Sequence, residues 1–420
     1  MRQLAERFAA RGHRVTVVTS KLRERKACEI NGVTIVEFDV SGNLAGKLTG
    51  EVEAYRRFVL QCDYDVFLVK AAQQWTLDAL LPVLDEMRRP KIFVPCGFSG
   101  LYEPAYAEYF RRMPEVMQKF DHLIFYASDY RDINFARDHG QSHFTVVPNG
   151  ADEREFDVPA DPGFRRRHSI GEETFVVLTI GTLTSGQKGH RELAQAFAQA
   201  DFRGVPALLL LNGNRLARGP SGSLLFRLKA AIAHIRQEGN AVRTAKSVTE
   251  ELLIRARLHW LWPRGGGRQP IETLVANINR GAPAKRAMLC DLPRAELIQA
   301  YLNSDLFVFA SNIEYSPLVL YEAAAAGLPF LSVPVGNAIE IARSTSGGTI
   351  CPAPTDTQGY TRVDPAVLAR HIERLAADPL ALAALGEGGR RNWAQKFTWE
   401  KIAQQYEALF QMMANQAEKS

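Results

Sequence analysis

The sequence has 420 residues, which is long for one hydrophobic core, so two or more domains are expected. With 46% hydrophobic and 23% charged residues it has the composition of an ordinary globular protein, and no run of 18 apolar residues predicts a membrane-spanning helix. The five cysteines are scattered without a CxxC pair, and residues 1–20 predict a helix and a strand instead of a signal peptide. We therefore expect a cytoplasmic protein.

Short apolar runs alternate with helical patterns along the chain. After a helix at 3–10, strands are predicted at 13–20, 65–71, 91–97, 122–128, 144–150, 175–181, 207–213, 305–311 and 329–336. Helices are predicted at 190–200, 293–304 and 397–416. Most of these strands are near-continuously apolar, which is typical of parallel sheets covered by helices on both faces. Two consecutive series of this kind predict an α/β protein with two doubly wound, Rossmann-like domains.

A segment rich in Pro, Gly and Asp at 147–164 separates the two series. We expect an N-terminal domain at 1–150, a C-terminal domain at 151–396, and a last helix at 397–420 that packs back toward the first domain. The first series opens with a helix, whereas such domains normally open with a strand and a glycine-containing loop. This difference predicts that a first strand, about 20 residues long with its loop, is missing.

Two glutamates eight residues apart, Glu314 and Glu322, flank a predicted helix start near Pro317. The first N–H groups of a helix lack partners and the helix dipole favours negative charge, so such a loop can bind an anion. At 1.5 Å per residue, Glu322 would lie roughly 7–8 Å along the helix from its start. By themselves, two such glutamates can also be a loop carboxylate and a solvated helix carboxylate.

The chain resembles the retaining glycosyltransferases of family 4, which have the GT-B fold with two Rossmann-like domains facing across a cleft. Five segments carry the resemblance in order along nearly the whole chain: RGHRVTVVTS (11–20), VPNGADEREF (147–156), GTLTSGQKGHRELAQAF (181–197), SNIEYSPLVLYEAAAAGLPF (311–330) and KFTWEKIAQQY (396–406).

The resemblance implies a donor site for a nucleotide-diphosphate sugar on the C-terminal domain. Lys188 would bind the diphosphate, Glu314 would face the donor sugar and the reaction centre, and Glu322 would bind the ribose hydroxyls. The donor-binding residues would also include the following: Gly181, Thr182, Ser316, Leu318 and Val319. No metal or other cofactor is expected, because a fixed cation and a helix N-terminus can stabilise the charge on the departing diphosphate.

Three positions differ from the usual family pattern. Thr182 stands where an arginine is common, and Pro317 replaces a common glycine and has no N–H to donate. Cys96-Gly97 occupies the place of a frequent His-Gly, and Cys96 is interpreted as a small buried residue.

Other motifs point away from other enzyme classes. Asp63-Tyr64-Asp65 resembles a metal-binding Asp-x-Asp, but it precedes a strand and is interpreted as a turn cap. HExxH, GxxxxGK[ST] and a GxGxxG following a strand are all absent from the sequence, which argues against a zinc hydrolase, a P-loop NTPase and a dinucleotide oxidoreductase.

A basic segment interrupts the second series. Residues 215–286 contain 14 Lys and Arg against four Glu and no Asp, although the net charge of the chain is only +5. The amphipathic stretches 223–239 and 247–268 suit contact with an anionic membrane surface, and an extra helical hairpin with a solvated basic face is the alternative. No nucleic-acid-binding module is recognisable.

The expected function is transfer of a sugar, with retention, to a glycan or lipid-linked acceptor in cell-surface polysaccharide or lipopolysaccharide biosynthesis. The protein would be cytoplasmic and peripheral on the inner face of the membrane. Two alternatives are a GT-B nucleotide-sugar epimerase or glycogen-type synthase, and a degenerate, non-catalytic protein that binds a nucleotide sugar.

Overall fold

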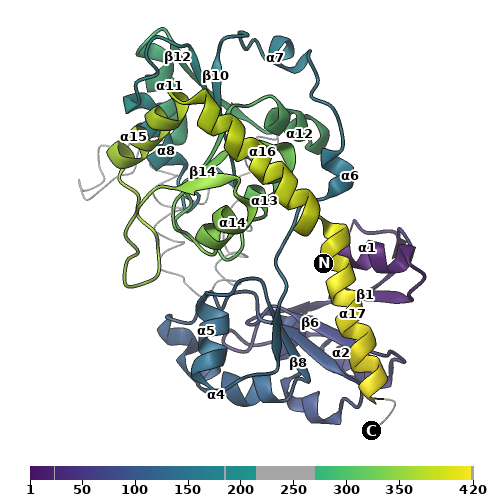
Figure 1. Cartoon of the computed structure of the whole chain (residues 1–420). Coiled ribbons are helices and arrows are strands. Elements are labelled where there is room, and N and C mark those ends of the chain that lie inside the picture. Colours follow the sequence, from purple (N-terminus) through teal and green to yellow (C-terminus); the bar gives the residue numbers. More distant parts are fainter. Residues whose placement is uncertain (23, 184–185, 214–269, 418–420) are drawn as a thin grey trace.

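The structure, a computed structural model, describes residues 1–22, 24–183, 186–213 and 270–417 (Figure 1). The stretches 223–239 and 247–268, which carry the predicted membrane contact, lie outside the described residues. None of the helices described is both long and apolar enough to cross a membrane.

A six-stranded parallel sheet forms the C-terminal part of the chain, in the order β12-β11-β10-β13-β14-β15. Its strands are β10 (Phe175–Ile180), β11 (Ala207–Asn212), β12 (Lys285–Cys290), β13 (Leu306–Phe309), β14 (Phe330–Ser332) and β15 (Gly348–Ile350). The helices of this part are α8 (His190–Gln199), α11 (Ile271–Arg280), α12 (Arg294–Leu302), α13 (Leu318–Ala326), α14 (Ala338–Thr345) and α15 (Pro365–Ala376). The predicted doubly wound α/β architecture is confirmed here.

The apolar runs that predicted strands lie in the middle of this sheet. Every residue of β11 is buried, and so is every residue of β13. The sequence did not predict β12 and β15, the two edge strands, because their side chains are mostly half-buried and do not form a continuous apolar run. β12 even begins with two cations, Lys285 and Arg286.

The N-terminal part contains three separate sheets. A parallel four-stranded sheet has the order β6-β7-β8-β9, a second sheet has the order β1-β3-β2, and β4 pairs with β5. Their bounds are β1 (Val15–Ser20), β2 (Glu29–Ile30), β3 (Val33–Phe38), β4 (Val40–Ser41), β5 (Thr49–Gly50), β6 (Phe67–Lys70), β7 (Lys91–Val94), β8 (His122–Phe125) and β9 (Phe144–Val146). The helices are α1 (Arg2–Ala10), α2 (Val52–Gln61), α3 (Trp75–Asp78), α4 (Ala107–Gln118) and α5 (Arg131–Asp138), with 3-10 turns at Leu81–Glu86 and Pro104–Tyr106.

These three sheets differ from the single sheet that the apolar runs suggested for the N-terminal domain. Within the described residues β1 and β6 are not paired with each other, so the parallel strands of this part belong to two sheets. The short strands β2, β4 and β5 were not predicted, because two-residue strands leave no periodic signal.

A crossing segment with α6 (Glu153–Phe156) and α7 (Phe164–Arg167) leads from β9 to β10. At the other end of the chain, α16 (Pro379–Lys396) lies on the C-terminal part and α17 (Trp399–Ala417) continues down along the N-terminal part (Figure 1). Ile402 and Tyr406 of α17 share a buried cluster with Leu4 and Phe8 of α1 and Ile92 of β7. The division of the chain at residue 150 stays a prediction.

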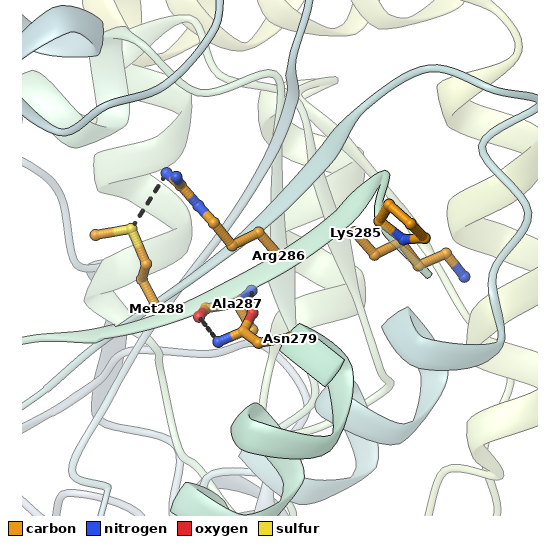
Figure 2. Close-up of a pocket in the computed structure, with 6 residues that line it drawn as sticks. Asn279, Lys285, Arg286, Ala287 and Met288 are labelled. Carbon is orange, nitrogen blue, oxygen red and sulfur yellow. Dashed lines mark hydrogen bonds between the residues drawn. The ribbon is translucent and has the colours of Figure 1, made fainter. Parts of the chain in front are cut away.

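The edge strand β12 is covered by a side chain of α11. Asn279 donates from Nδ2 to the Ala287 carbonyl (3.0 Å) and accepts from the Ala287 N–H at Oδ1 (2.8 Å), as a neighbouring strand would (Figure 2). A hollow of about 380 Å³ lies beside this strand, lined by Asn279, Arg286 and Met288 among others. The pairing blocks two of the open hydrogen-bonding groups that make sheet edges prone to aggregation.

Candidate functional site

The order of the large sheet reverses between β10 and β13. The chain continues from β10 outward to β11 and β12 on one side, and from β13 outward to β14 and β15 on the other. In open α/β sheets the loops leaving such a pair of strands diverge, and ligands bind between them at the carboxyl ends of the strands. The loops that follow β10 and β13 are the ones that contain Lys188 and Glu314.

A glycine allows the loop after β10 to lie very close to the end of β13. Gly189 has φ 66° and precedes α8, and a Cβ atom placed on it would lie 1.7 Å from the Ala310 carbonyl oxygen. Only glycine tolerates both the left-handed backbone and this approach. Earlier in the loop, Gly181 donates its N–H to the Asn212 carbonyl (3.0 Å) and is followed by Thr182.

This approach places Lys188 in contact with Glu314. The ammonium group forms an ion pair with Glu314 Oε1, and the two side chains are 29% and 18% exposed. Ser311 donates from Oγ to the same carboxylate oxygen (3.2 Å), and the Asn312 N–H donates to the Gln187 carbonyl (2.7 Å). Among the described residues, Oε2 of Glu314 has no hydrogen-bond partner.

A second basic residue close to Lys188, His190, carries no charge near pH 7. His190, the first residue of α8, is 6% exposed, and burial lowers the pKa of its imidazole to about 4. The ring is therefore neutral near pH 7, and Lys188 supplies the positive charge beside Glu314.

α13 begins directly after the loop that holds Glu314. Pro317 precedes its first turn, as the sequence predicted, Leu318 and Val319 belong to that turn, and Gly327 (φ 69°) follows its last residue. Within the described part of the chain, the N–H groups of Leu318 and Val319 have no hydrogen-bond acceptor. The preceding residue, Ser316, accepts a hydrogen bond at its carbonyl from Asn149 Nδ2 (3.2 Å).

Glu322 lies on α13 and is held at both oxygens. Arg294 donates from Nη2 to Oε1 (2.7 Å), and the buried Tyr301 donates its hydroxyl to Oε2 (2.8 Å). Burial and the charge of Glu322 raise the pKa of Tyr301. Burial lowers the pKa of Arg294, but the hydrogen bond to Glu155 and the charge of Glu322 outweigh it and raise the pKa overall.

The sequence reasoning did not identify Arg294 and Tyr301. They are seven residues apart on α12, so they lie on the same face of that helix. The spacing becomes informative only when one knows that this face packs against α13, which is a tertiary contact.

Residues of the N-terminal part reach the Glu314 loop through an aromatic cluster around Tyr315. The Tyr315 ring lies 4.8 Å from the Tyr130 ring and 5.5 Å from the Tyr126 ring. Tyr130 donates its hydroxyl to the Glu314 carbonyl (2.6 Å), and the Tyr126 N–H donates to the Tyr315 hydroxyl (2.9 Å). A Cβ on Gly97 would lie 2.8 Å from Tyr315 Cγ, so glycine leaves the room for this ring.

Asp132 contacts this cluster through Tyr315 and is fully buried. Burial raises the pKa of Asp132 from 3.8 to about 6, although hydrogen bonds from Tyr315 and from the Gly97 and Ile133 N–H groups lower it. Cys96 is only half-buried, so the prediction of a fully buried residue is wrong, but desolvation by the surrounding protein still raises the pKa of its thiol, which disfavours the nucleophilic thiolate.

The candidate metal motif Asp63-Tyr64-Asp65 lies between α2 and β6. Asp63 accepts a hydrogen bond from Arg14 (3.2 Å), and both side chains are mostly exposed. Across the described residues, no group of three or more His, Cys, Asp or Glu is arranged to hold a metal ion.

Two family models match the chain. Residues 1–155 match the model described as Glycosyltransferase Family 4, and residues 265–392 match Glycosyl transferases group 1. Together the two matched segments cover more than half of the chain.

Curated relatives match over a shorter stretch. A D-inositol 3-phosphate glycosyltransferase of Streptomyces bingchenggensis (strain BCW-1) is 34% identical over 108 residues, 26% of this chain and 22% of that protein. One from Salinispora arenicola (strain CNS-205) is 33% identical over 106 residues, 25% of this chain and 21% of that protein. The match thus spans about a fifth of the length of these relatives.

Solved structures match over nearly the whole chain. A sucrose-phosphate synthase from Thermosynechococcus elongatus has a TM-score of 0.67 at 18% identity, covering 98% of this chain and 92% of that one. Anabaena HepE in complex with UDP and glucose has a TM-score of 0.65 at 17% identity, covering 98% and 94%. At these identities the likeness establishes the fold, which is GT-B.

The close approach of Gly189 to β13 can be tested by comparison with Gly186. Both glycines are left-handed (φ 66° and 63°), but a Cβ on Gly186 meets no atom within 4 Å. Gly186→Ala should lower the free energy of unfolding by about 1–2 kcal/mol from backbone strain alone. Gly189→Ala should cost roughly 1–3 kcal/mol more because of the clash, as measured by urea unfolding. Equal costs would contradict the packing of Gly189 against Ala310.

The stability of the protein should depend on pH through Asp132. Its folded-state pKa of about 6 lies above the unfolded value of 3.8, so the folded state binds the proton more tightly. This stabilisation is complete below the unfolded pKa and is lost as the pH rises through the folded pKa. Between about pH 4 and 7, urea unfolding should show the wild type losing stability relative to Asp132→Asn. A difference that stays constant over this range would mean that burial does not shift the pKa of Asp132.

Proposed function

Because the chain belongs to the glycosyltransferases of the family 4 type, we propose that it transfers a sugar from a nucleotide-diphosphate sugar to a glycan or lipid-linked acceptor. The observation that carries this proposal is the contact between Lys188 and Glu314 at the point where the order of the large sheet reverses. The solved structure of the similar Anabaena HepE with UDP and glucose supports a donor of this class.

Lys188 and the start of α13 are proposed to bind the donor diphosphate. The ammonium group supplies a full positive charge, and the N–H groups of Leu318 and Val319, which have no acceptor among the described residues, supply the partial charge of a helix N-terminus. The backbones of Gly181, Thr182 and Ser316 complete this part of the proposed site. The diphosphate would then compete with Glu314 for Lys188.

Glu314 is proposed to face the transferred sugar. Its Oε1 is held by Lys188 and Ser311, so its Oε2 can accept a sugar hydroxyl. As the bond from the sugar to the diphosphate breaks, positive charge develops on the sugar and negative charge on the phosphate. A carboxylate on one side and Lys188 on the other would stabilise both without a metal ion. Transfer with retention, which the resemblance implies, is part of this proposal.

Glu322 is proposed to bind the ribose of the donor. A carboxylate can accept bonds from two neighbouring hydroxyls, and each oxygen keeps acceptor capacity beside its bond to Arg294 or Tyr301.

The acceptor is proposed to be a precursor of a cell-surface polysaccharide or lipopolysaccharide. Support comes from the basic composition of residues 215–286, which suits an anionic membrane surface carrying a lipid-linked acceptor.

The two glutamates should respond differently to replacement by alanine. Glu322→Ala should weaken binding of the nucleoside diphosphate roughly ten- to a hundredfold, because the hydrogen bonds to the ribose are lost. Glu314→Ala should leave this affinity unchanged or higher, because Lys188 loses its competing partner, and should lower kcat about 10²–10³-fold. Calorimetry with UDP, GDP and ADP, together with turnover, measures both.

Glu296→Ala is the matched control for this comparison. Glu296 lies on α12 and pairs with Arg167 and His168, away from Glu322, and its side chain is 27% exposed. An equal loss of diphosphate affinity in the Glu314 and Glu322 variants would contradict the separate roles. If none of the three diphosphates raises the melting temperature of the wild type, the proposed donor site itself is wrong.

A donor-only incubation separates transfer from epimerisation. With the nucleotide sugar that binds best and no acceptor, a transferase should leave the sugar configuration unchanged apart from slow hydrolysis. Conversion of the donor into its epimer, followed by NMR of the sugar, would favour the epimerase alternative.

A further inference from the structure

Two ion pairs that share Arg294 connect the proposed ribose-binding Glu322 to the crossing segment. Arg294 contacts Glu155 through two bonds, Nε to Oε1 (3.0 Å) and Nη2 to Oε2 (2.5 Å). The same Nη2 also donates to Glu322 Oε1 (2.7 Å). Arg294 therefore forms a bidentate contact with the Glu155 carboxylate and a single hydrogen bond with the Glu322 carboxylate.

Glu155 belongs to α6, which is tied to both parts of the chain. The residue before α6, Asp152, and its first residue, Glu153, accept hydrogen bonds from Arg7 of α1 at 2.7 Å and 2.5 Å. Arg7 is only 2% exposed, and these two carboxylates balance its buried charge, while Gln3 of α1 accepts further hydrogen bonds from it. Ala151 is bonded through its N–H to the Phe397 carbonyl (3.0 Å), at the junction of α16 and α17.

The opposite side of Arg294 is fixed by packing. Its guanidinium lies 5.9 Å from the ring of Phe156, the last residue of α6, and Phe156 packs edge-on against Tyr301 at 5.8 Å. Tyr301 in turn holds Oε2 of Glu322. The carboxylate of Glu322 is therefore held at one oxygen by Arg294 and at the other by Tyr301, and both of these residues contact α6.

We propose that Arg294 is a positioning residue, which orients the Glu322 carboxylate toward the two hydroxyls of the donor ribose and ties that orientation to the crossing segment through Glu155. This inference rests on the proposed function, because it requires that Glu322 binds a ribose. Without Arg294, the Glu322 side chain gains rotational freedom and loses the charge that balances it. The cost should therefore fall on recognition of the ribose hydroxyls and leave the diphosphate contacts at Lys188 intact.

The test compares ribose with 2′-deoxyribose. The probe is whichever of UDP, GDP and ADP binds the wild type most tightly, together with its 2′-deoxy form, and the measurement is calorimetry on the full chain. We expect the wild type to favour the ribose form by roughly tenfold, the value of about one hydrogen bond to a charged group. Arg294→Met should reduce this preference to less than about threefold, and Arg294→Lys should restore part of it.

Arg167→Met is the matched control. Arg167 is 45% exposed against 41% for Arg294, and it also bridges two carboxylates, Asp161 and Glu296, neither of which is bonded to Glu322. It should leave the ribose preference as in the wild type. A folded Arg294→Met variant that keeps the full preference would overturn the positioning role and leave the proposed function standing.

Glu155→Gln tests the connection to the crossing segment, and it is isosteric, so it should fold. By itself, Glu155→Gln should change the affinity for the ribose form. In a double-mutant cycle it should add little to the effect of Arg294→Met, because both changes break the same series of contacts from Glu155 through Arg294 to Glu322. Fully additive effects would overturn the connection to α6. A wild type that binds none of the three diphosphates would overturn the proposed function and this inference together, whereas binding without any ribose preference would overturn only the roles of Glu322 and Arg294.

Discussion

The contact between Gly189 and the Ala310 carbonyl is the constraint on which the site depends. β10 and β13 are neighbours in the large sheet, yet the chain leaves them toward opposite sides. The loops would diverge if nothing joined them. A residue without a side chain lets the backbone after β10 lie on the end of β13, and Lys188, the residue before it, is paired with Glu314 of the loop after β13.

Each glutamate of the pair is balanced by a cation from a different element. Lys188, from the loop before α8, pairs with Glu314, and Arg294, from the start of α12, pairs with Glu322. Both carboxylates are mostly buried, and burying a charge is costly unless it is paired and hydrogen-bonded. The two cations differ in the number of carboxylates they contact. Among the described residues Lys188 is paired with Glu314 alone, and the proposed donor diphosphate would compete with that carboxylate. Arg294 is bonded to Glu155 as well as to Glu322. The Arg294–Glu322 pair is therefore the more firmly held of the two.

The two parts of the chain meet at two places with different chemistry. Near Glu314 the contact is aromatic: Tyr315 inserts between Tyr126 and Tyr130. At the crossing segment the contact is ionic and centres on the buried Arg7. Both contacts end on residues next to the glutamates of the site, Tyr315 beside Glu314 and Glu155 bonded to the arginine of Glu322. A change in the arrangement of the two parts would therefore alter the contacts around both Glu314 and Glu322.

The sequence by itself determined the parallel α/β architecture, the central strands of the large sheet and the start of α13, because continuous apolar runs and a proline at a helix start are local signals. Its resemblance to family 4 singled out Glu314, Glu322 and Lys188, whose binding roles stay a prediction. The sequence did not predict β12 or β15, whose half-buried side chains give no continuous pattern. Only the tertiary structure decided which cation each glutamate pairs with, since Lys188 is 126 residues from Glu314, and Arg294 is 28 residues from Glu322 and 139 from Glu155. Such pairs depend on the order of the strands and on the faces that helices turn to each other, and no single segment of the sequence carries that information.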